Sequence, residues 1–125
     1  MHNSTFDEFN GSAIVGADAI IDLYNVNIWN GTSLSGTSPV NCEDWRGFSV
    51  LESRFYNNTS TQRGAISAKT EAGNPIYSKF IVESSQFINN TAENAGAMYV
   101  SNHNMEIRNW TFESNRATHG YGGGL

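Results

Sequence analysis

Two stretches of this chain follow the same twelve-residue pattern, FYNNTSTQRGAI at residues 55–66 and FINNTAENAGAM at residues 87–98. Each runs from a Phe through Asn-Asn-Thr to Gly-Ala and then a large apolar residue, at identical spacing. A repeated unit of this kind indicates that the chain builds the same piece of structure several times.

A pattern of eight residues precedes both copies and occurs four times along the chain. Its four occurrences are IDLYNVNI (21–28), FSVLESRF (48–55), FIVESSQF (80–87) and MEIRNWTF (105–112). The first, third and eighth residues of every octad are apolar. With Phe6, the eighth residues are spaced by 22, 27, 32 and 25 residues, so the repeat units vary in length.

Apolar residues alternate at the start of each octad, as in Phe48/Val50 and Phe80/Val82, which is typical of a strand with one buried face. No apolar run keeps the helical period for more than a turn. A period in the twenties with about three short strands per unit predicts an all-β solenoid of about five short three-strand coils, stacked about 4.8 Å apart. The differences in unit length predict loop insertions at about 31–47 and 67–79.

Stacked coils place equivalent residues in columns. The eighth octad positions predict a core column whose stacked rings gain more than area burial alone: Ile28, Phe55, Phe87 and Phe112. Asparagines three residues further on predict a hydrogen-bonded ladder: Asn58, Asn90 and Asn115. We expect Gly64 and Gly96 to allow tight turns, and Ala65 and Ala97 to fit where neighbouring walls come close.

The phrases FINNTAENAGAM, FYNNTSTQRGAI and TFESNRATHGYGGGL resemble the polymorphic outer-membrane protein repeat, in which F-x-x-N-x-A is followed by G-G-A-I. That repeat is best known from chlamydial autotransporter adhesins and recurs in large surface proteins of protists. The resemblance covers about residues 5–125 and implies a right-handed parallel β-helix that serves as an adhesive or structural surface stalk. The chain departs from the pattern where Arg63 and Ala95 fill the second glycine position, and its first two units match only loosely.

Length and composition narrow the class of protein. The 125 residues fit one domain, 1–125, or a fragment of a longer solenoid. A net charge of −5 and seven unclustered Lys and Arg residues argue against a nucleic-acid or anionic-membrane surface. No apolar run reaches the roughly 20 residues that span a bilayer, so we expect no membrane insertion by this segment. Abundant Asn, Ser, Thr and Gly with little charge favour an extracellular or cell-surface location.

Asn-x-Ser/Thr sequons begin at seven positions: Asn3, Asn10, Asn30, Asn57, Asn58, Asn89 and Asn109. This excess suggests a glycoprotein of the secretory pathway. We expect glycans on Asn57 or Asn89, on Asn30 and on Asn109, whereas Asn58 in the inward ladder should be bare. The alternative is that the repeat itself supplies three of the sequons, and glycans about 5 Å apart on stacked coils would crowd one another.

Parallel β-helices also carry pectate lyases and polygalacturonases, and inverting glycoside hydrolysis needs two carboxylates across the scissile bond. The outward octad columns contain no neighbouring carboxylates: Asp22/Ser49/Ile81/Glu106, Tyr24/Leu51/Glu83/Arg108 and Asn25/Glu52/Ser84/Asn109. Glu83 beside Arg108 predicts a surface ion pair. His2, His103 and His119 have no nucleophile placed against them, and no cluster has metal-ligand spacing. We therefore predict no catalytic, cofactor or metal site.

One candidate interaction loop remains. The segment 31–47 carries Trp45 and Arg46, residue types common at binding hot spots, although Trp45 folding back on the coil is the alternative. The single cysteine, Cys42, excludes an internal disulfide, and we expect an ordinary loop thiol.

Both ends of a short solenoid are open, which predicts docking to other subunits or to further coils of the same chain. The sequence thus predicts a non-catalytic extracellular structural or adhesive module of a stalk, filament or adhesin. The alternatives are a fragment of a carbohydrate-active β-helix enzyme whose catalytic coils lie outside this chain, and an internal rod of an intracellular filament.

Overall fold

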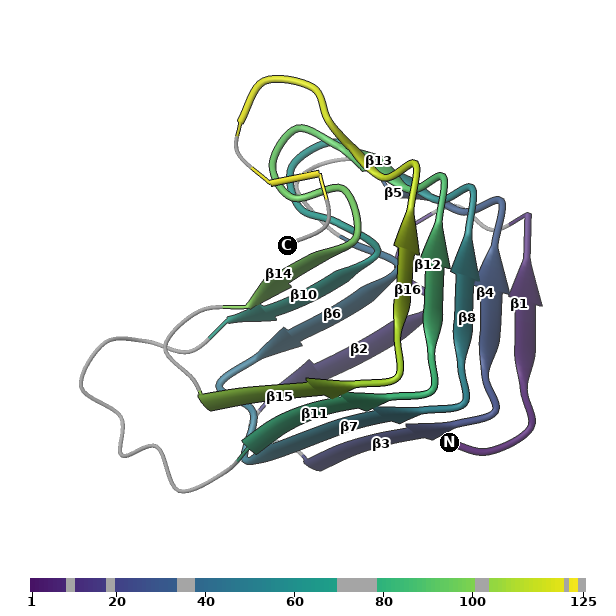
Figure 1. The fold of residues 1–125 in the computed structure, drawn as a ribbon, viewed down its shortest axis with the longest axis vertical. Helices are drawn as coiled ribbons and strands as arrows, with labels where there is room; N and C mark the ends of the chain where they lie inside the picture. The colour runs from purple at the N-terminus through teal and green to yellow at the C-terminus, as the bar shows by residue number, and fades with distance from the viewer. Residues whose placement is uncertain are drawn as a thin grey trace.

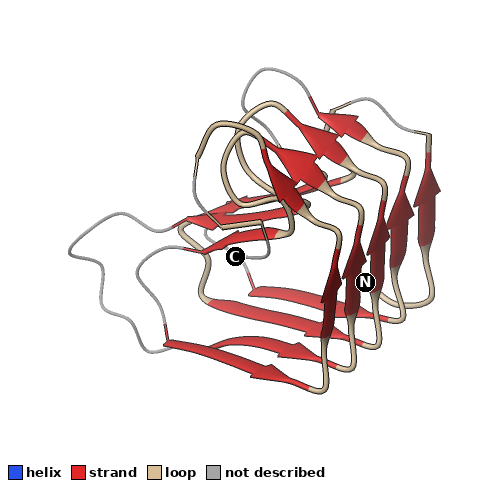
Figure 2. Ribbon diagram, turned by 45° about the horizontal axis from the view of Figure 1, so that its top comes forward, coloured by secondary structure: helices blue, strands red, loops and turns tan. Residues whose placement is uncertain are grey.

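A computed structural model describes residues 1–8, 11–17, 20–33, 38–69, 79–100, 104–120 and 122–123. Within these residues the regular structure is entirely β, with no helix (Figure 2). The expectation of an all-β chain is therefore confirmed. Each strand is short, between two and five residues, and every pairing between strands is parallel.

The strands form four sheets, numbered in the order in which the chain passes through them from β2 onwards. Sheet 1 contains β2 (Ile14–Ala17), β6 (Val40–Glu43), β10 (Ile66–Lys69) and β14 (Met98–Val100). Sheet 2 contains β3 (Ile20–Tyr24), β7 (Gly47–Leu51), β11 (Lys79–Glu83) and β15 (Asn104–Arg108). Sheet 3 contains β1 (Thr5–Asp7), β4 (Asn27–Trp29), β8 (Arg54–Tyr56), β12 (Gln86–Ile88) and β16 (Thr111–Glu113). Sheet 4 contains β5 (Thr32–Ser33), β9 (Thr59–Ser60), β13 (Thr91–Ala92) and β17 (Arg116–Ala117).

The chain visits the four sheets in turn and then begins the next coil, whose strands pair in parallel with those of the coil before (Figure 1). Stacked parallel coils of this kind match the solenoid expected from the repeat. In the described residues, β1 precedes four coils of four strands each. The prediction of three strands per coil was wrong, because each strand of sheet 4 has only two residues, such as Thr59–Ser60, too few to show alternation in the sequence.

The expected insertion at 31–47 is largely part of the coil. Its described residues include β5 and β6, and β6 pairs with both β2 and β10. The second expected insertion, 67–79, begins inside β10 and ends on the first residue of β11, while residues 70–78 lie outside the described residues.

The core consists of inward columns that run from coil to coil. In sheet 3, the Phe55 and Phe87 rings stack with centroids 4.7 Å apart and planes 2° apart, and Phe112 lies 4.9 Å beyond Phe87. Ile28 is in register with Phe55, so the column continues into the first coil. A second stack, in sheet 2, joins Phe48 and Phe80 at 4.7 Å. Aromatic columns therefore line two of the inner walls.

The predicted asparagines lie in a second kind of column, at the corner between sheets 3 and 4. Asn58 Nδ2 donates to Asn90 Oδ1 (3.0 Å) and to the Ile28 carbonyl (2.9 Å). Asn90 Nδ2 donates in the same way to Asn115 Oδ1 (3.0 Å) and to the Phe55 carbonyl (3.0 Å). The Asn58 N–H also donates to Asn90 Oδ1 (3.1 Å). Each amide thus satisfies buried groups on two coils, as buried polar atoms require.

A serine ladder at the corner between sheets 2 and 3 was not anticipated. The Val26 N–H donates to Ser53 Oγ, and the Ser53 N–H donates to Ser85 Oγ, both at 3.1 Å. Both serines are buried and hold the sixth octad position. That shared position is the signal that sequence reasoning missed.

Gly64 and Gly96 are required for a reason other than turning. Neither has a positive φ. A Cβ on Gly64 would lie 2.3 Å from the Ala95 carbonyl oxygen, and one on Gly96 would lie 2.5 Å from the Arg116 nitrogen. These glycines allow the backbones of successive coils to approach closely, as glycine does within sheets.

Candidate functional site

Three of the predicted glycosylation sites form an exposed column at the corner between sheets 3 and 4. Asn30, Asn57 and Asn89 have φ angles of 54°, 52° and 54°, in the left-handed region. Asparagine enters this region more readily than most residues. The corner conformation therefore accounts for asparagine at these positions whether or not they carry a glycan.

The amides of this column are held to different degrees. Asn30 Nδ2 donates to Asp7 Oδ1 (2.9 Å), whereas the bond from Asn57 Nδ2 to Asn30 Oδ1 is long, at 3.5 Å. Asn58, the next residue along, is 1 % exposed and fully engaged in the inner ladder, so its sequon is inaccessible in the folded chain.

Asn109, the fourth predicted glycosylation site, lies at the corner between sheets 2 and 3. It is exposed, has a φ of 46°, and donates from Nδ2 to Ser84 Oγ (3.2 Å). Asn10, which begins another sequon, lies outside the described residues.

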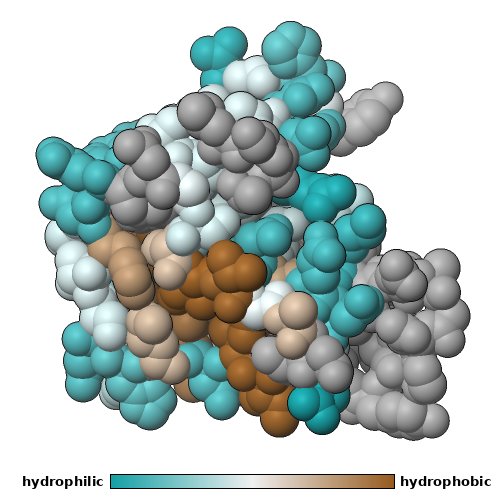
Figure 3. All heavy atoms as spheres, turned by 180° about the vertical axis from the view of Figure 1, so that it is seen from behind, coloured by the Kyte–Doolittle hydropathy of each residue, from teal (hydrophilic) through white to brown (hydrophobic). Residues whose placement is uncertain are grey.

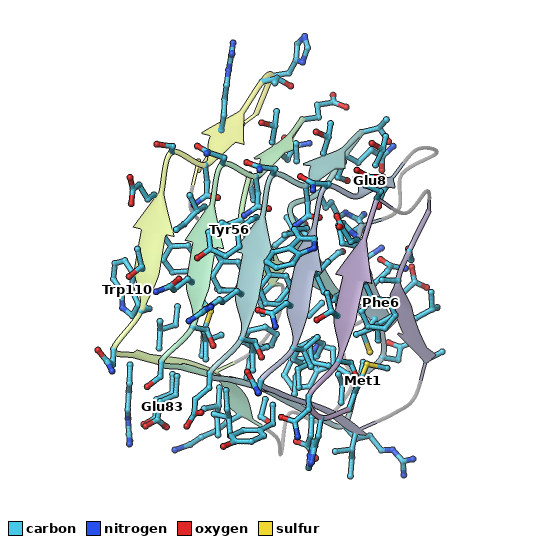
Figure 4. The ribbon with its side chains drawn as sticks, turned by 90° about the vertical axis from the view of Figure 1, so that its right-hand side faces the viewer. Met1, Phe6, Glu8, Tyr56, Glu83 and Trp110 are labelled. Carbon is cyan, nitrogen blue, oxygen red and sulfur yellow. The ribbon has the colours of Figure 1, made fainter. Side chains whose placement is uncertain are left out.

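A shallow hollow of about 320 Å³ lies on the outer face of sheet 3, beside the asparagine column. Its lining residues are Trp29, Asn30, Arg54, Tyr56 and Asn57. The Trp29 and Tyr56 ring centroids are 6.4 Å apart with planes inclined by 50°, and the Tyr56 hydroxyl donates to Gln86 Oε1 (2.5 Å). Figure 4 looks onto this sheet and shows Tyr56 near its middle. The hollow combines two aromatic rings with a cation and two amides.

The structure places the two residues of the predicted interaction loop differently. Trp45 is 3 % exposed and packs edge-on against Phe48 and Phe80, with centroids 6.1 Å and 5.7 Å away. Its ring is therefore core and offers no surface to a partner. The adjacent Arg46 is exposed. The alternative interpretation, that Trp45 folds back on the coil, is therefore confirmed.

Carboxylates on the outer face of sheet 2 have polar or basic neighbours. Asp22 Oδ1 accepts a hydrogen bond from Ser49 Oγ (2.5 Å). Arg108 pairs with Glu106 on its own strand, and Lys79 pairs with the same carboxylate at 3.3 Å. Within the described residues no ion pair joins Arg108 to Glu83, contrary to expectation, although the two are in register.

Cys42 is buried in sheet 1, not in a loop. Burial, followed by the nearby charges of Asp44 and Glu43, raises the pKa of its thiol from the ordinary 9.0 to about 11. A thiol with a raised pKa is a poor nucleophile near neutral pH.

The described part of the chain contains no group of three or more His, Cys, Asp or Glu side chains able to hold a metal ion. It also includes no helix long and apolar enough to cross a membrane. His103 lies outside the described residues, and His119 Nδ1 lies 3.1 Å from Thr118 Oγ1.

A larger hollow of about 520 Å³ lies at the C-terminal coil. It is lined by Gln62, Arg63, Asn94, Ala95, Met98, Tyr99, Val100 and Met105. The Arg63 guanidinium carbon lies 5.1 Å from the Tyr99 ring centroid, within the range of a cation–π contact. This hollow therefore includes side chains from the last coil's sheets 1 and 2.

Comparison of the chain with protein-family models, with curated proteins and with solved structures finds no match in any of the three.

Proposed function

We propose that this chain is a non-catalytic structural or adhesive module of an extracellular stalk or filament, built as a right-handed parallel β-helix. One observation carries the proposal. The core side chains of the middle coils are buried, whereas those of the first and last coils are partly exposed. Further coils of the same chain, or other subunits, continue the core columns.

The C-terminal end supports this proposal. Met105 is in register with Phe80 but is 40 % exposed, whereas Phe80 is fully buried. Trp110, which follows the serine ladder in the last coil, is 51 % exposed. These side chains occupy core positions that the described residues leave partly uncovered.

The N-terminal end is similar. Phe6 and Ile14 are only partly buried, although their column partners Ile28 and Val40 are fully buried. Figure 3 shows hydrophobic surface gathered on the face opposite to that of Figure 1, between polar borders. Uncovered strand edges and apolar surface invite pairing with another chain unless they are covered.

The right-handed coiling of the proposed β-helix and its proposed extracellular location rest on further arguments. Connections between parallel strands of one sheet are overwhelmingly right-handed, and the resemblance to the outer-membrane protein repeat implies the same hand. The exposed sequon asparagines at the corners suit a surface glycoprotein. Pairing of Asp22 with Ser49 and of Arg108 with Glu106 favours a solvated surface on sheet 2 over an acid–base pair.

Sedimentation velocity over a wide concentration range tests the docking of the ends. We expect the wild-type chain to form end-to-end oligomers at high concentration and Met105→Lys to remove them, because a charge on the apolar rim must be desolvated on docking. Ile81→Lys, on the outer face of the neighbouring strand, is the matched control and should associate like the wild type. A wild-type chain that stays monomeric throughout would contradict the docking of the ends to other subunits.

A further inference from the structure

The three stacked sequons of the corner column differ in the residue that precedes the asparagine. Trp29 precedes Asn30 and Tyr56 precedes Asn57, but Ile88 precedes Asn89. All three preceding residues are partly buried on the outer face of sheet 3, and they are in register with one another. Within one column, two sequons therefore follow an aromatic residue and the third follows an aliphatic residue, so their behaviour can be compared directly.

The hollow of about 320 Å³ lies at the aromatic part of this column. Its lining includes both rings, both adjacent sequon asparagines and the Arg54 side chain. Small-molecule sites typically combine apolar surface with a few convergent polar groups. A pyranose ring has the matching chemistry, because its C–H face is apolar and its hydroxyl and N-acetyl groups are polar.

An attached sugar needs little intrinsic affinity to occupy such a hollow. A covalent tether replaces a bimolecular encounter with a high effective concentration, so a weak contact is enough to hold the tethered group in place. The hollow is open and shallow compared with sites that capture free ligands. This argument favours a sugar attached to the chain over a free saccharide.

Of the two asparagines in the hollow, Asn57 is the better attachment point. Asn30 Nδ2 is held by Asp7 at 2.9 Å, whereas Asn57 Nδ2 makes only the long bond of 3.5 Å. The hydroxyl residue of the Asn57 sequon, Thr59, is exposed.

We propose that an N-glycan on Asn57 folds back onto the chain, with its first N-acetylhexosamine in the hollow against Trp29 and Tyr56. The inference rests on the extracellular location proposed above. The sugar covers apolar ring surface that is otherwise exposed to water, so it stabilises the β4–β8 pair. The glycan is then part of the wall of the solenoid rather than a freely moving appendage.

The test is a cycle of variants secreted from a eukaryotic host, with the same variants made in bacteria as the baseline without N-glycans. Thr59→Ala blocks the Asn57 sequon and leaves the corner asparagine in place. Tyr56→Ile copies the residue that the next coil has at this position. Thr91→Ala, which blocks the Asn89 sequon beside Ile88, is the matched control. Site occupancy is read by mass spectrometry of glycopeptides.

The change in Tm that each substitution causes in the bacterial protein is first subtracted. We then expect loss of the Asn57 glycan to lower Tm by about 3 °C when Tyr56 is present. The same loss should change Tm by less than about 1 °C in the Tyr56→Ile background, and so should loss of an Asn89 glycan. Nuclear Overhauser contacts between the N-acetyl methyl group and the Trp29 or Tyr56 ring protons give a second readout.

The outcomes separate the two proposals. An Asn57 glycan whose effect on Tm is the same with Tyr56 and with Ile, and which lacks contacts to the rings, overturns the inference and leaves the proposed function standing. Glycans at other sequons with Asn57 bare overturn the inference as well. A chain that passes through the secretory pathway with every sequon bare contradicts the proposed glycoprotein itself.

Discussion

Adjacent asparagines in this chain perform opposite tasks. Asn57 is exposed and turns the backbone with a φ of 52°, whereas Asn58 is buried and bonds to the Ile28 carbonyl and to Asn90. The left-handed residue redirects the chain so that the next side chain points inward. The Asn-Asn pair of the repeat thus encodes a corner, with one asparagine for the backbone and one for the hydrogen bonds of the interior.

The inner asparagine should be far less tolerant of substitution than the outer one. Asn90→Ala leaves the buried Asn58 N–H and the Phe55 carbonyl without this partner, which predicts a loss of about 2–4 kcal/mol in the free energy of unfolding. Asn89→Gly keeps the left-handed corner available and should change stability by less than about 0.5 kcal/mol. Urea unfolding of the two variants measures the difference, and equal losses would contradict the division of roles.

Cys42 predicts a fall in stability at alkaline pH. Its thiol has a pKa of about 11 in the folded chain, against an ordinary 9.0, so the folded state holds the proton more tightly than the unfolded state. The contribution of this difference in pKa to the free energy of unfolding is fully present below pH 9 and is lost as the pH rises towards 11. Unfolding of wild type and Cys42→Ala between these pH values isolates the effect from other titrating groups. A constant stability difference between them across this range would refute it.

At the scale of the element, the corner between sheets 4 and 1 depends on backbone contact. Gly64→Ala places a methyl group 2.3 Å from the Ala95 carbonyl oxygen of the next coil, and the other nearest atoms are also backbone, which limits relaxation. We expect a loss of about 2–3 kcal/mol, in the range of overpacked sites. Gly47→Ala is the control, because its Cβ would meet only the Ile20 side chain, at 3.5 Å. Similar thermal unfolding of both variants would show that Gly64 has no special role.

The elements that sequence reasoning could predict are those with a long enough pattern. A five-residue strand is long enough to show alternation, as β7 does with Phe48 and Val50. The regular positions of Phe55, Phe87 and Phe112 in the repeat likewise predict that they share one column. A two-residue strand has no period to detect, so the fourth sheet was missed.

The sequence also did not predict which of several neighbouring residues a given side chain would contact. Arg108 faces Glu83 across the ladder but pairs with Glu106. For Trp45 the sequence left two alternatives open, a partner contact and packing on the coil, and the structure shows packing against Phe80. Of the candidate site, the column of sequons followed from the repeat. The hollow beside it did not, because its rings and its asparagines come from two coils.

At the scale of the whole molecule, each strand pairs only with strands of the neighbouring coils, as the order of sheet 3 shows: β1-β4-β8-β12-β16. Stability in such an array is approximately a sum of coil and interface contributions. A coil in the middle has two interfaces, whereas an end coil has one. The unequal burial of Phe87 and Phe112 reflects the same asymmetry in the packing of the core.

This asymmetry predicts that the described solenoid opens from its ends. Amide hydrogen exchange should be slowest in β8 and β12, which are paired on both sides, and at least about tenfold faster in β1 and β16. The reason is that an end coil can separate after losing a single interface, while a central strand must wait for its neighbours. If a further subunit covers the C-terminal end, which is one of the two ways in which the proposed function continues the columns, β16 should become protected at the concentrations where oligomers form, and Met105→Lys should abolish that gain. Equal exchange in all four strands would show that the coils unfold only together, and would contradict opening from the ends.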